Sequence, residues 1–227
     1  MCKTREQELG HIYFIKVFDR KGNIMDNRAM FKIGYGLYVL TAREGERDNG
    51  CIINAAIQVT STPNRIAVTV NKQNKTHDMI ASTGEFNLSI LTTQAPFSVF
   101  KHFGFQTGRD TDKFDNLEGF SRAENGVSYI AKYTNSYISG KVIQSIDLGT
   151  HTMFISDVTE AEVLSSISTV TYDYYQQNIK PKPQPKAEVS VGYRCEVCGY
   201  IYEGEVLPED FVCPVCKHGV SDFVKLS

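Results

Sequence analysis

The sequence lacks any apolar run that approaches the ~20 residues needed to cross a bilayer. Its start, residues 1–8, is charged rather than apolar, so we expect no secretory signal and a cytoplasmic location. A long basic tract is missing too: Lys plus Arg is 24, Asp plus Glu is 26, and the net charge is -2. Because proteins that follow a phosphate backbone need clustered cations, nucleic acid is not an expected partner.

Cysteine is scarce until the C-terminal end of the chain. Cys2 and Cys51 are isolated, whereas the other four cysteines form two Cys-x-x-Cys pairs near the C-terminus. In a reducing compartment this pattern indicates metal binding more often than disulfides. Cys51 lies in a strand-like run, so we expect it to pack in the core rather than to react.

A sharp change of composition at 178–191 predicts a boundary between two domains. Three prolines alternate there with lysines: Pro181, Pro183 and Pro185, with Lys180, Lys182 and Lys186. Regularly spaced proline disfavours helix and sheet and favours an extended, semi-rigid spacer, although a surface loop within one domain is the alternative. The expected organisation is an N-terminal extension (1–27), a main domain (28–178), a linker (179–191) and a small C-terminal domain (192–227).

The main domain is predicted to be mainly β, an antiparallel barrel with a few helices. Turn signals at Asn49-Gly50 and at Thr62-Pro63-Asn64 separate short runs of β-branched and aromatic residues. The expected strands are 37–41, 65–70, 86–91, 129–133, 141–146 and 152–158, and residues 11–23 could add a hairpin. One helix is expected from Thr76, as N-cap, to a stop at Gly84, and another at roughly 95–102.

The four C-terminal cysteines predict a tetrahedral metal site formed by Cys195, Cys198, Cys213 and Cys216. Two residues between the cysteines of a pair let both thiolates point into one turn, and Gly199 and Gly219 permit the positive φ angles that such turns need. A domain of about 35 residues cannot depend on an apolar core alone, so the metal must supply much of its folding free energy. Spacing alone slightly favours zinc and does not separate zinc from iron.

The flanks of these cysteines resemble rubredoxin over residues 193–225. The shared pattern is Tyr193-x-Cys195-x-x-Cys198-Gly199-Tyr200-x-Tyr202, then 207–214, Cys216, Asp222 and Phe223. The segment between the two pairs is shorter than in free-standing rubredoxins, and Phe211 stands where an indole is common. The resemblance implies an iron ion that keeps four sulfur ligands while it carries one electron at a time.

Residues 28–178 resemble the flavin reductase-like family, whose fold is an FMN-binding split barrel. The motifs lie, in the family's order, at 35–42, 54–63, 71–77, 85–91, 103–114 and 149–155. The resemblance implies FMN as cofactor, NADH or NADPH as a transient substrate, and a homodimer with FMN near the subunit interface. The sequence contains no Gly-x-Gly-x-x-Gly fingerprint, so NAD(P)H is expected to bind over the flavin face.

The resemblance also nominates residues for the flavin. Ring-edge contacts are expected from Asn54, Ala55, Ala56, Gln58, Thr60 and Ser61, and phosphate donors from Asn71, Lys72, Asn74 and Thr76. Phe103 and Gly104 belong to a further motif, and His151 is expected near the flavin or nicotinamide, as the candidate catalytic residue. The alternatives are a simple capped turn at 71–76 and a structural histidine at 151. The Gly108-Arg109-Asp110 loop could contact the nicotinamide cofactor, but a salt-bridged surface loop is the favoured interpretation.

The expected activity is an FMN-dependent NAD(P)H oxidoreductase. By resemblance, FMN takes a hydride and passes single electrons to the iron and on to a protein acceptor such as a flavodiiron oxygen or nitric-oxide reductase. One alternative is a flavin or ferric reductase that acts directly on small acceptors. The other is a flavoprotein whose tail is a zinc ribbon that docks a partner.

Overall fold

The computed structural model describes residues 17–18, 24–25, 27–181, 192–197, 199–215 and 218–226. The chain divides into two units. The larger is Gly34–Ala187 with Cys213–Lys217, and the other is Met1–Ile33 with Glu188–Val212 and His218–Ser227. None of the helices in these described ranges combines the length and apolar character needed to span a membrane.

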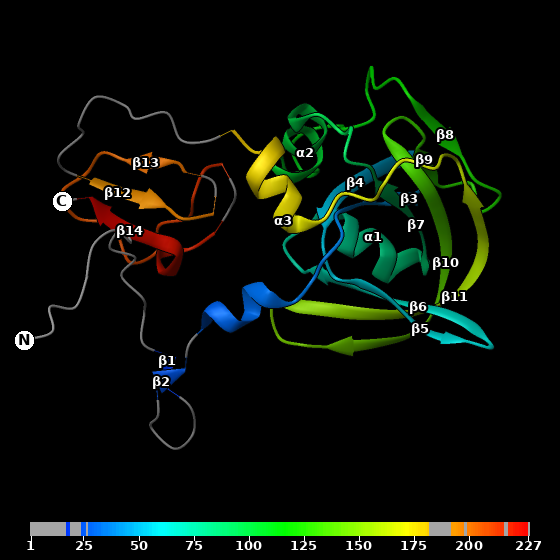
Figure 1. The fold of residues 1–227 in the computed structure, drawn as a ribbon, viewed down its shortest axis with the longest axis horizontal. Helices are drawn as coiled ribbons and strands as arrows, with labels where there is room; N and C mark the ends of the chain where they lie inside the picture. Colours follow the sequence, from blue (N-terminus) through cyan, green and yellow to red (C-terminus); the bar gives the residue numbers. More distant parts are fainter. Residues whose placement is uncertain are drawn as a thin grey trace, which may run out of the picture. The chain divides into compact units, whose positions relative to one another are not determined.

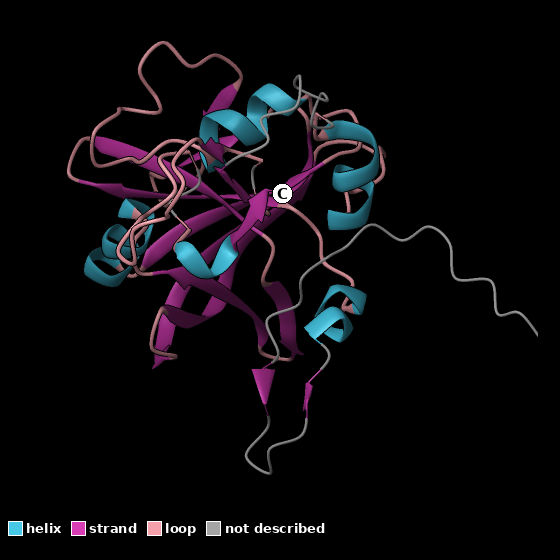
Figure 2. Cartoon of the chain, turned by 90° about the vertical axis from the view of Figure 1, so that its left-hand side faces the viewer, coloured by secondary structure: helices cyan, strands magenta, loops and turns pink. Residues whose placement is uncertain are grey.

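The larger unit is built on one seven-stranded antiparallel sheet with the order β4-β3-β7-β10-β11-β6-β5. Figure 1 shows these strands curving around the unit, and Figure 2 shows them, in magenta, crossing it at an angle to one another. The strands are β3 (Tyr38–Glu44), β4 (Arg47–Ile53), β5 (Ala56–Ser61), β6 (Asn64–Asn71), β7 (Glu85–Leu91), β10 (Thr134–Asp147) and β11 (His151–Val163). The predicted mainly β, antiparallel fold class is confirmed.

The sheet bends where the long strands β10 and β11 change register. The register shifts lie between Ser139 and Gly140 and between Val142 and Gln144. Gly140 also makes room for a core ring, since a Cβ there would lie 2.4 Å from Phe86 Cζ. Bulges increase local twist, which lets one sheet curve around a core.

Two clusters of buried side chains fill the larger unit. The first includes Leu40, Ile53, Val68, Met79, Ile80, Phe86 and Phe154, and the second includes Leu37, Val39, Leu91, Phe100, Phe103, Val170 and Tyr175. β4 contributes to both, since Cys51 and Ile53 belong to the first cluster while Ile52 packs against the second. Alternate residues of a strand point to opposite faces, so the two clusters lie on opposite faces of β4.

The two predicted helices are present with shifted starts. α1 (Lys75–Thr83) begins after Asn74, so Thr76 is not the N-cap but lies within the first turn. Its end is as predicted, because Gly84 adopts φ 73 and its N–H bonds to Ile80 O. α2 (Phe97–Gly104) begins after Pro96. α1 packs against β3 and β4, and α2 packs against β4.

Other boundaries differ from the sequence prediction. Asn49-Gly50 was predicted as a turn but lies inside β4, because tertiary contacts stabilise it there: Asn49 is 1% exposed, and Gly50 lets the Phe103 ring approach. The predicted strand 129–133 is the short β9 (Ser128–Ile130), paired with β8 (Phe120–Arg122). The remaining predicted strands overlap β3, β6, β7, β10 and β11.

A helical segment just before the linker was missed. It comprises α3 (Tyr172–Tyr174) and a π-helix, η2 (Tyr175–Ile179). Tyr175 is buried, and its ring centroid lies 4.6 Å from that of Phe100 in α2, so α2 and α3 lie side by side in Figure 1. The segment therefore belongs to the core of the larger unit. Of the predicted linker, 182–191 lies outside the described residues.

The second unit contains two small antiparallel sheets. β1 (Val17–Phe18) pairs with β2 (Ile24–Met25), as the predicted N-terminal hairpin requires, and a 3-10 helix, η1 (Asn27–Lys32), follows. Residues 11–16 and 19–23 of the predicted hairpin lie outside the described residues. The other sheet has the order β13-β12-β14, formed by β12 (Gly192–Cys195), β13 (Ile201–Tyr202) and β14 (Phe223–Leu226), and a 3-10 turn, η3 (Val220–Asp222), leads into β14.

Candidate cofactor and metal sites

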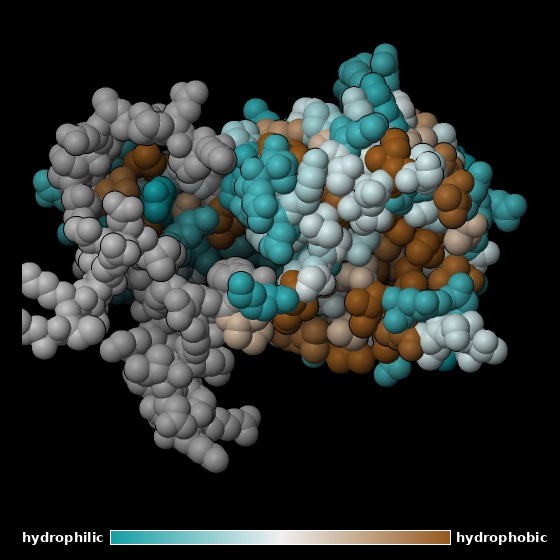
Figure 3. All heavy atoms as spheres, viewed as in Figure 1, coloured by the Kyte–Doolittle hydropathy of each residue, from teal (hydrophilic) through white to brown (hydrophobic). Residues whose placement is uncertain are grey.

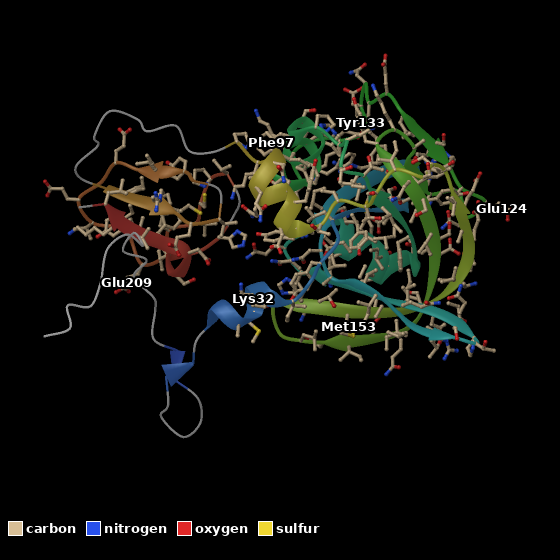
Figure 4. All side chains as sticks on the ribbon, in the orientation of Figure 1. Lys32, Phe97, Glu124, Tyr133, Met153 and Glu209 are labelled. Atoms are coloured by element: carbon tan, nitrogen blue, oxygen red, sulfur yellow. The ribbon has the colours of Figure 1, made fainter. Side chains whose placement is uncertain are left out.

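Four of the predicted flavin residues meet where β6 ends, α1 begins and β11 begins. His151 lies opposite Asn71 in the β11–β6 ladder, and Lys72 N donates to Thr150 O at 3.0 Å. Asn74 is the N-cap of α1. Met153, labelled in Figure 4, marks this end of β11. Since the first N–H groups of a helix have no partner within it, this junction brings amide donors close to residues 71 and 72.

Thr76 belongs to the same turn, but its side chain faces the core. It is 0% exposed, and its Oγ1 accepts a hydrogen bond from Asn49 Nδ2 at 2.9 Å. Burial raises the pKa of the neighbouring Cys51 thiol, and a hydrogen bond with Thr76 partly opposes that rise. The Thr76 hydroxyl is therefore not on the surface, and only its backbone N–H fits the predicted phosphate role. Cys51, as expected, is buried.

The predicted ring-edge residues fall into two groups along β6. Ala55 O accepts from Thr69 N at 2.9 Å and Ala56 pairs with Val68, so the 54–56 corner lies near the α1 end of β6. The second group lies at the opposite end: Gln58 pairs with Ile66, Thr60 with Arg65 and Ser61 with Asn64. The seven steps from Asn64 to Asn71 span about 23 Å at ~3.3 Å per residue. The corner 54–56 is thus the group that lies beside the predicted phosphate donors.

Phe103 and Gly104 lie away from this junction. Both are in the last turn of α2, where the Phe103 ring packs over Gly50, and a Cβ on Gly104 would lie 3.3 Å from Ile52 Cγ1. Gly50 and Ile52 face the second core cluster, whereas Asn49 on the adjacent strand position bonds to α1. The structure therefore places Phe103 and Gly104 in core packing on the other face of β4.

The cations at the junction are paired with exposed carboxylates. Lys72 Nζ lies 2.7 Å from Asp147 Oδ1, and Lys75 Nζ lies 3.0 Å from Glu44 Oε2. The hydrogen bond from Lys72, followed by one from the Gly149 N–H, lowers the pKa of Asp147. Exposed ion pairs of this kind contribute little to stability, so an arriving phosphate can compete for either lysine.

A chain of polar contacts beside the junction includes residues that were not nominated from the sequence. His77 Nε2 lies 2.9 Å from Thr152 Oγ1, and His77 Nδ1 lies 3.1 Å from Asp78 Oδ1. Asp78 Oδ2 in turn accepts from Arg109 Nη2 at 2.8 Å. Desolvation alone would raise the pKa of Asp78, but hydrogen bonds from His77 and Arg109 outweigh it and lower that pKa.

This chain confirms the salt-bridged interpretation of the Gly108-Arg109-Asp110 loop. The signal for His77 and Asp78 was available in the sequence, because they directly follow the nominated Thr76 on a predicted helix. What the sequence does not show is that Thr152 and Arg109, distant along the chain, meet them.

The C-terminal cysteines that the structure describes are both fully buried. Cys195, the last residue of β12, and Cys213 are each 0% exposed, while Cys198 and Cys216 lie outside the described residues. The turn after Cys195 is closed by two hydrogen bonds, Gly199 N to Cys195 O and Cys195 N to Tyr200 O, both 2.8 Å. Gly199 adopts φ 79, as predicted. Gly219 does not need a glycine's freedom, because it is extended at φ -82.

Aromatic side chains surround Phe211 in this small unit. Ring centroids of Tyr202 and Phe223 lie 4.8 and 5.4 Å from that of Phe211, and Tyr200 stacks at 6.4 Å. β14 joins the group to β12, since Phe223 pairs with Cys195. A small aromatic cluster is therefore present beside Cys195.

Exposed apolar side chains gather on one face of the larger unit. Figure 3 shows hydrophobic residues over the region of β5, β6, β10 and β11. The members that are large and exposed are Ile57, Val59, Ile143, Ile146 and Leu148. Contiguous apolar surface of this kind marks an interaction site more often than bare solvent contact.

Comparisons with known proteins agree with both parts of the chain. The family model "Flavin reductase like domain" matches residues 30–182, and "Rubrerythrin, rubredoxin-like domain" matches residues 193–224. A high molecular weight rubredoxin from Moorella thermoacetica is 36% identical over 230 residues, which cover 89% of this chain and 100% of the relative.

Two further proteins are similar over the larger unit. A ferric-chelate reductase (NAD(P)H) from Archaeoglobus fulgidus is 36% identical over 165 residues, covering 73% of this chain and 97% of the relative. The crystal structure of an FMN-binding protein from Thermus thermophilus has a TM-score of 0.55 at 17% identity, covering 72% of this chain and 81% of that one. The chain belongs to the flavin reductase-like family of NAD(P)H oxidoreductases and carries a C-terminal rubredoxin-like domain.

Proposed function

We propose that this protein takes electron pairs from NADH or NADPH onto FMN and releases them singly through an iron ion bound by Cys195, Cys198, Cys213 and Cys216. The final acceptor is a redox protein, such as a flavodiiron oxygen or nitric-oxide reductase. The observation that carries the proposal is the joining, in one chain, of a flavin reductase-like domain and a rubredoxin-like domain, an arrangement shared with the Moorella relative.

The junction of β6, α1 and β11 fits a flavin phosphate. It offers N–H groups at the start of α1, the Asn71 amide and the Lys72 ammonium, whose pairing with Asp147 is exposed. The 54–56 corner lies beside it and would offer small residues and backbone groups to the ring edge. His151 lies opposite Asn71, and in this proposal it would orient a nicotinamide or ring atom. Bound FMN would supply the capacity to accept a hydride and to release electrons one at a time.

The C-terminal cysteines fit a metal ion by the chemistry of the donor set. Four thiolates are the ligands of tetrahedral iron or zinc sites, and Cys195 and Cys213 are buried as such ligands need to be. The hydrogen bonds that close the 195–200 turn fix the backbone around the first ligand. An iron ion there would carry one electron at a time with its ligands unchanged.

A homodimer is part of the same proposal. The exposed side chains of Ile57, Val59, Ile143, Ile146 and Leu148 form an apolar face on β5 and β10, near the turn into β11. A second copy seated on this face would remove it from water, and each buried side chain of this size contributes about 1.5–3 kcal/mol.

Anaerobic reduction tests the proposal directly. The purified protein, loaded with FMN and iron, is mixed with NADH or NADPH, and its visible spectrum is recorded. We expect the flavin and the ferric absorption to bleach together. Bleaching of the flavin with unchanged iron absorption would reject transfer to the iron, and failure of both nucleotides to bleach either centre would reject the activity.

A direct ferric or flavin reductase is the second candidate, because the Archaeoglobus relative is matched over 97% of its length by 73% of this chain. Replacement of the iron by zinc separates the two, since zinc keeps the cysteine site folded but carries no electrons. Electron delivery to a protein acceptor should disappear in the zinc form. If it persists unchanged, the flavin acts on its acceptors directly.

A third possibility, a zinc ribbon that docks a partner, is decided by metal analysis. The protein produced in cells given both metals should contain iron and be coloured. A stoichiometric content of zinc, with no iron, would favour the docking module.

A further inference from the structure

We propose that His77 is a positioning residue for the flavin, acting through Thr152 and Asp78. The inference rests on the proposed function, because it concerns the same junction of β6, α1 and β11. His77 is not among the residues that the sequence nominated for contact with the flavin. It lies between two segments that contain such residues. It directly follows Thr76 in the first turn of α1, and it contacts Thr152, the residue after His151 on β11.

The geometry links the two segments through both ring nitrogens of His77. Nε2 lies 2.9 Å from Thr152 Oγ1 on β11, and Nδ1 lies 3.1 Å from Oδ1 of Asp78 on α1. The side chain is 13% exposed, and its ring lies 5.6 Å from that of Phe154. A ring fixed on three sides in this way cannot turn without breaking at least one contact.

The hydrogen positions follow from the partners. A carboxylate only accepts, so Nδ1 must carry the proton that faces Asp78. In the neutral ring Nε2 is then an acceptor, and the Thr152 hydroxyl donates to it. Arg109 Nη2, 2.8 Å from the other oxygen of Asp78, holds that carboxylate in place and ties the 107–111 loop to the same chain. Every member of Thr152–His77–Asp78–Arg109 thus has a defined role as donor or acceptor.

The consequence is a fixed distance between the phosphate donors and His151. Asn71 lies at the end of β6 and pairs directly with His151, whereas the amide donors of α1 lie further along and are joined to β11 through His77. Thr152 is 8% exposed and pairs with Val70, one position from the His151–Asn71 pair. Loss of the bond between His77 and Thr152 should let the start of β11 move relative to α1, so both flavin affinity and nucleotide use should change.

A matched set of threonine variants tests the link. Thr152→Val removes the hydroxyl while keeping the shape of the side chain, and Thr152→Ser keeps the hydroxyl. Thr159→Val is the control on the same strand, because the Thr159 hydroxyl makes only a 3.4 Å contact with Ser139 O. For each full-length protein, FMN is removed and titrated back to measure its Kd. KM for NADH or NADPH, kcat and Tm are then measured on the reloaded protein.

Thr152→Val should raise the FMN Kd about five-fold, the ratio that corresponds to one lost hydrogen bond of about 1 kcal/mol, and should raise KM more than it lowers kcat. Thr152→Ser should restore both values, and Thr159→Val should match the wild type. His77→Gln, which keeps a donor and acceptor near Nε2 but loses the bond to Asp78, should give an intermediate Kd.

Two results overturn the assignment, and they differ from failure of the proposed function. If Thr152→Val lowers Tm but leaves Kd and KM unchanged, His77 is structural only. If Thr152→Ser is as impaired as Thr152→Val, the hydroxyl is not the link. If the wild-type protein binds no FMN, the proposed function fails first and the positioning role falls with it.

Discussion

The two parts of the chain bury their side chains in different ways. In the larger unit, Val39, Leu40, Val68, Met79 and Phe86 are all 0% exposed, and two clusters fill the interior. In the C-terminal part, the residues that are both described and buried are Gly192, Cys195 and Cys213. Its aromatic side chains are only half-buried.

This difference teaches where each part obtains its stability. The larger unit has enough apolar area removed from water to offset the entropy of ordering its chain. In the C-terminal part, Cys195 and Cys213 are more completely buried than the aromatic rings, as expected of a domain whose fold depends on a metal ion. Perturbing the metal and the apolar core should therefore affect different parts of the molecule.

Removal of the metal should have the largest effect. Metal binding supplies on the order of 10 kcal/mol to small cysteine-rich domains. Chelation, or Cys195→Ser, should therefore unfold residues 192–226 while the flavin domain stays intact. Hydrogen exchange measured by mass spectrometry would show rapid exchange confined to that segment. Slow exchange there in the metal-free protein would contradict the comparison, and restoring the metal is the control.

A cavity in the apolar core should destabilise the larger unit and leave the metal site folded. Phe86→Ala removes a fully buried ring and should lower the free energy of unfolding of the larger unit by about 3–5 kcal/mol. Its denaturant midpoint is the measurement, and the iron absorption should survive to higher denaturant than the flavin-domain signal. Phe120→Ala, at a ring 37% exposed, is the matched control and should cost far less.

Lys113→Met should lower the free energy of unfolding of the larger unit by less than Phe86→Ala does. Lys113 is 2% exposed, and its Nζ donates to Gly50 O and Phe103 O at 2.9 and 3.0 Å. Burial lowers the pKa of this ammonium, and the nearby Cys51 partly opposes that change. Methionine would leave two buried carbonyls without their donor, at a cost of about 1–3 kcal/mol. Thermal unfolding should show a lower Tm for Lys113→Met. Lys101→Met, at an exposed position on α2, is the control and should leave Tm unchanged.

Alkaline pH should cause the smallest change in the stability of the larger unit. Burial, and then the neighbouring Tyr172, raises the pKa of Tyr175 to about 12. An exposed tyrosine in the unfolded chain ionises near pH 10. The stabilising effect of keeping Tyr175 protonated in the folded protein is therefore complete below about pH 10, and it is lost as the pH rises through 12. Stability of the larger unit, followed by denaturant titration, should fall over that range, and Tyr175→Phe should flatten the fall. An unchanged slope would contradict the burial argument.

Much of the fold was predictable because local signals and tertiary packing agree. The strand 86–91, the stop of α1 at Gly84 and the left-handed Gly199 follow from propensity and from backbone sterics. Asn49-Gly50 shows where local signals fail. The pair is a strong turn signal on its own, but a bond to Thr76 and the approach of Phe103 keep it in a strand.

The sequence predicted which segments contribute to the candidate site, but not how those segments are arranged in space. Sequence motifs nominated Asn71, Asn74 and His151, which the fold brings together. They also nominated Phe103, which belongs to α2 and packs on the opposite face of β4. His77 lies within the 71–77 motif, but its contact with Thr152 was not predictable, because no local pattern places a residue so far along the chain beside it.

The central claim is that electrons pass from the flavin to the iron within this protein. Rapid mixing of the FMN- and iron-loaded protein with NADH or NADPH under anaerobic conditions, followed at the flavin and ferric absorption bands, tests it most directly. The account predicts that the flavin bleaches first and that the ferric band then disappears at a rate independent of added electron carriers. A ferric band that persists after complete flavin reduction would contradict it.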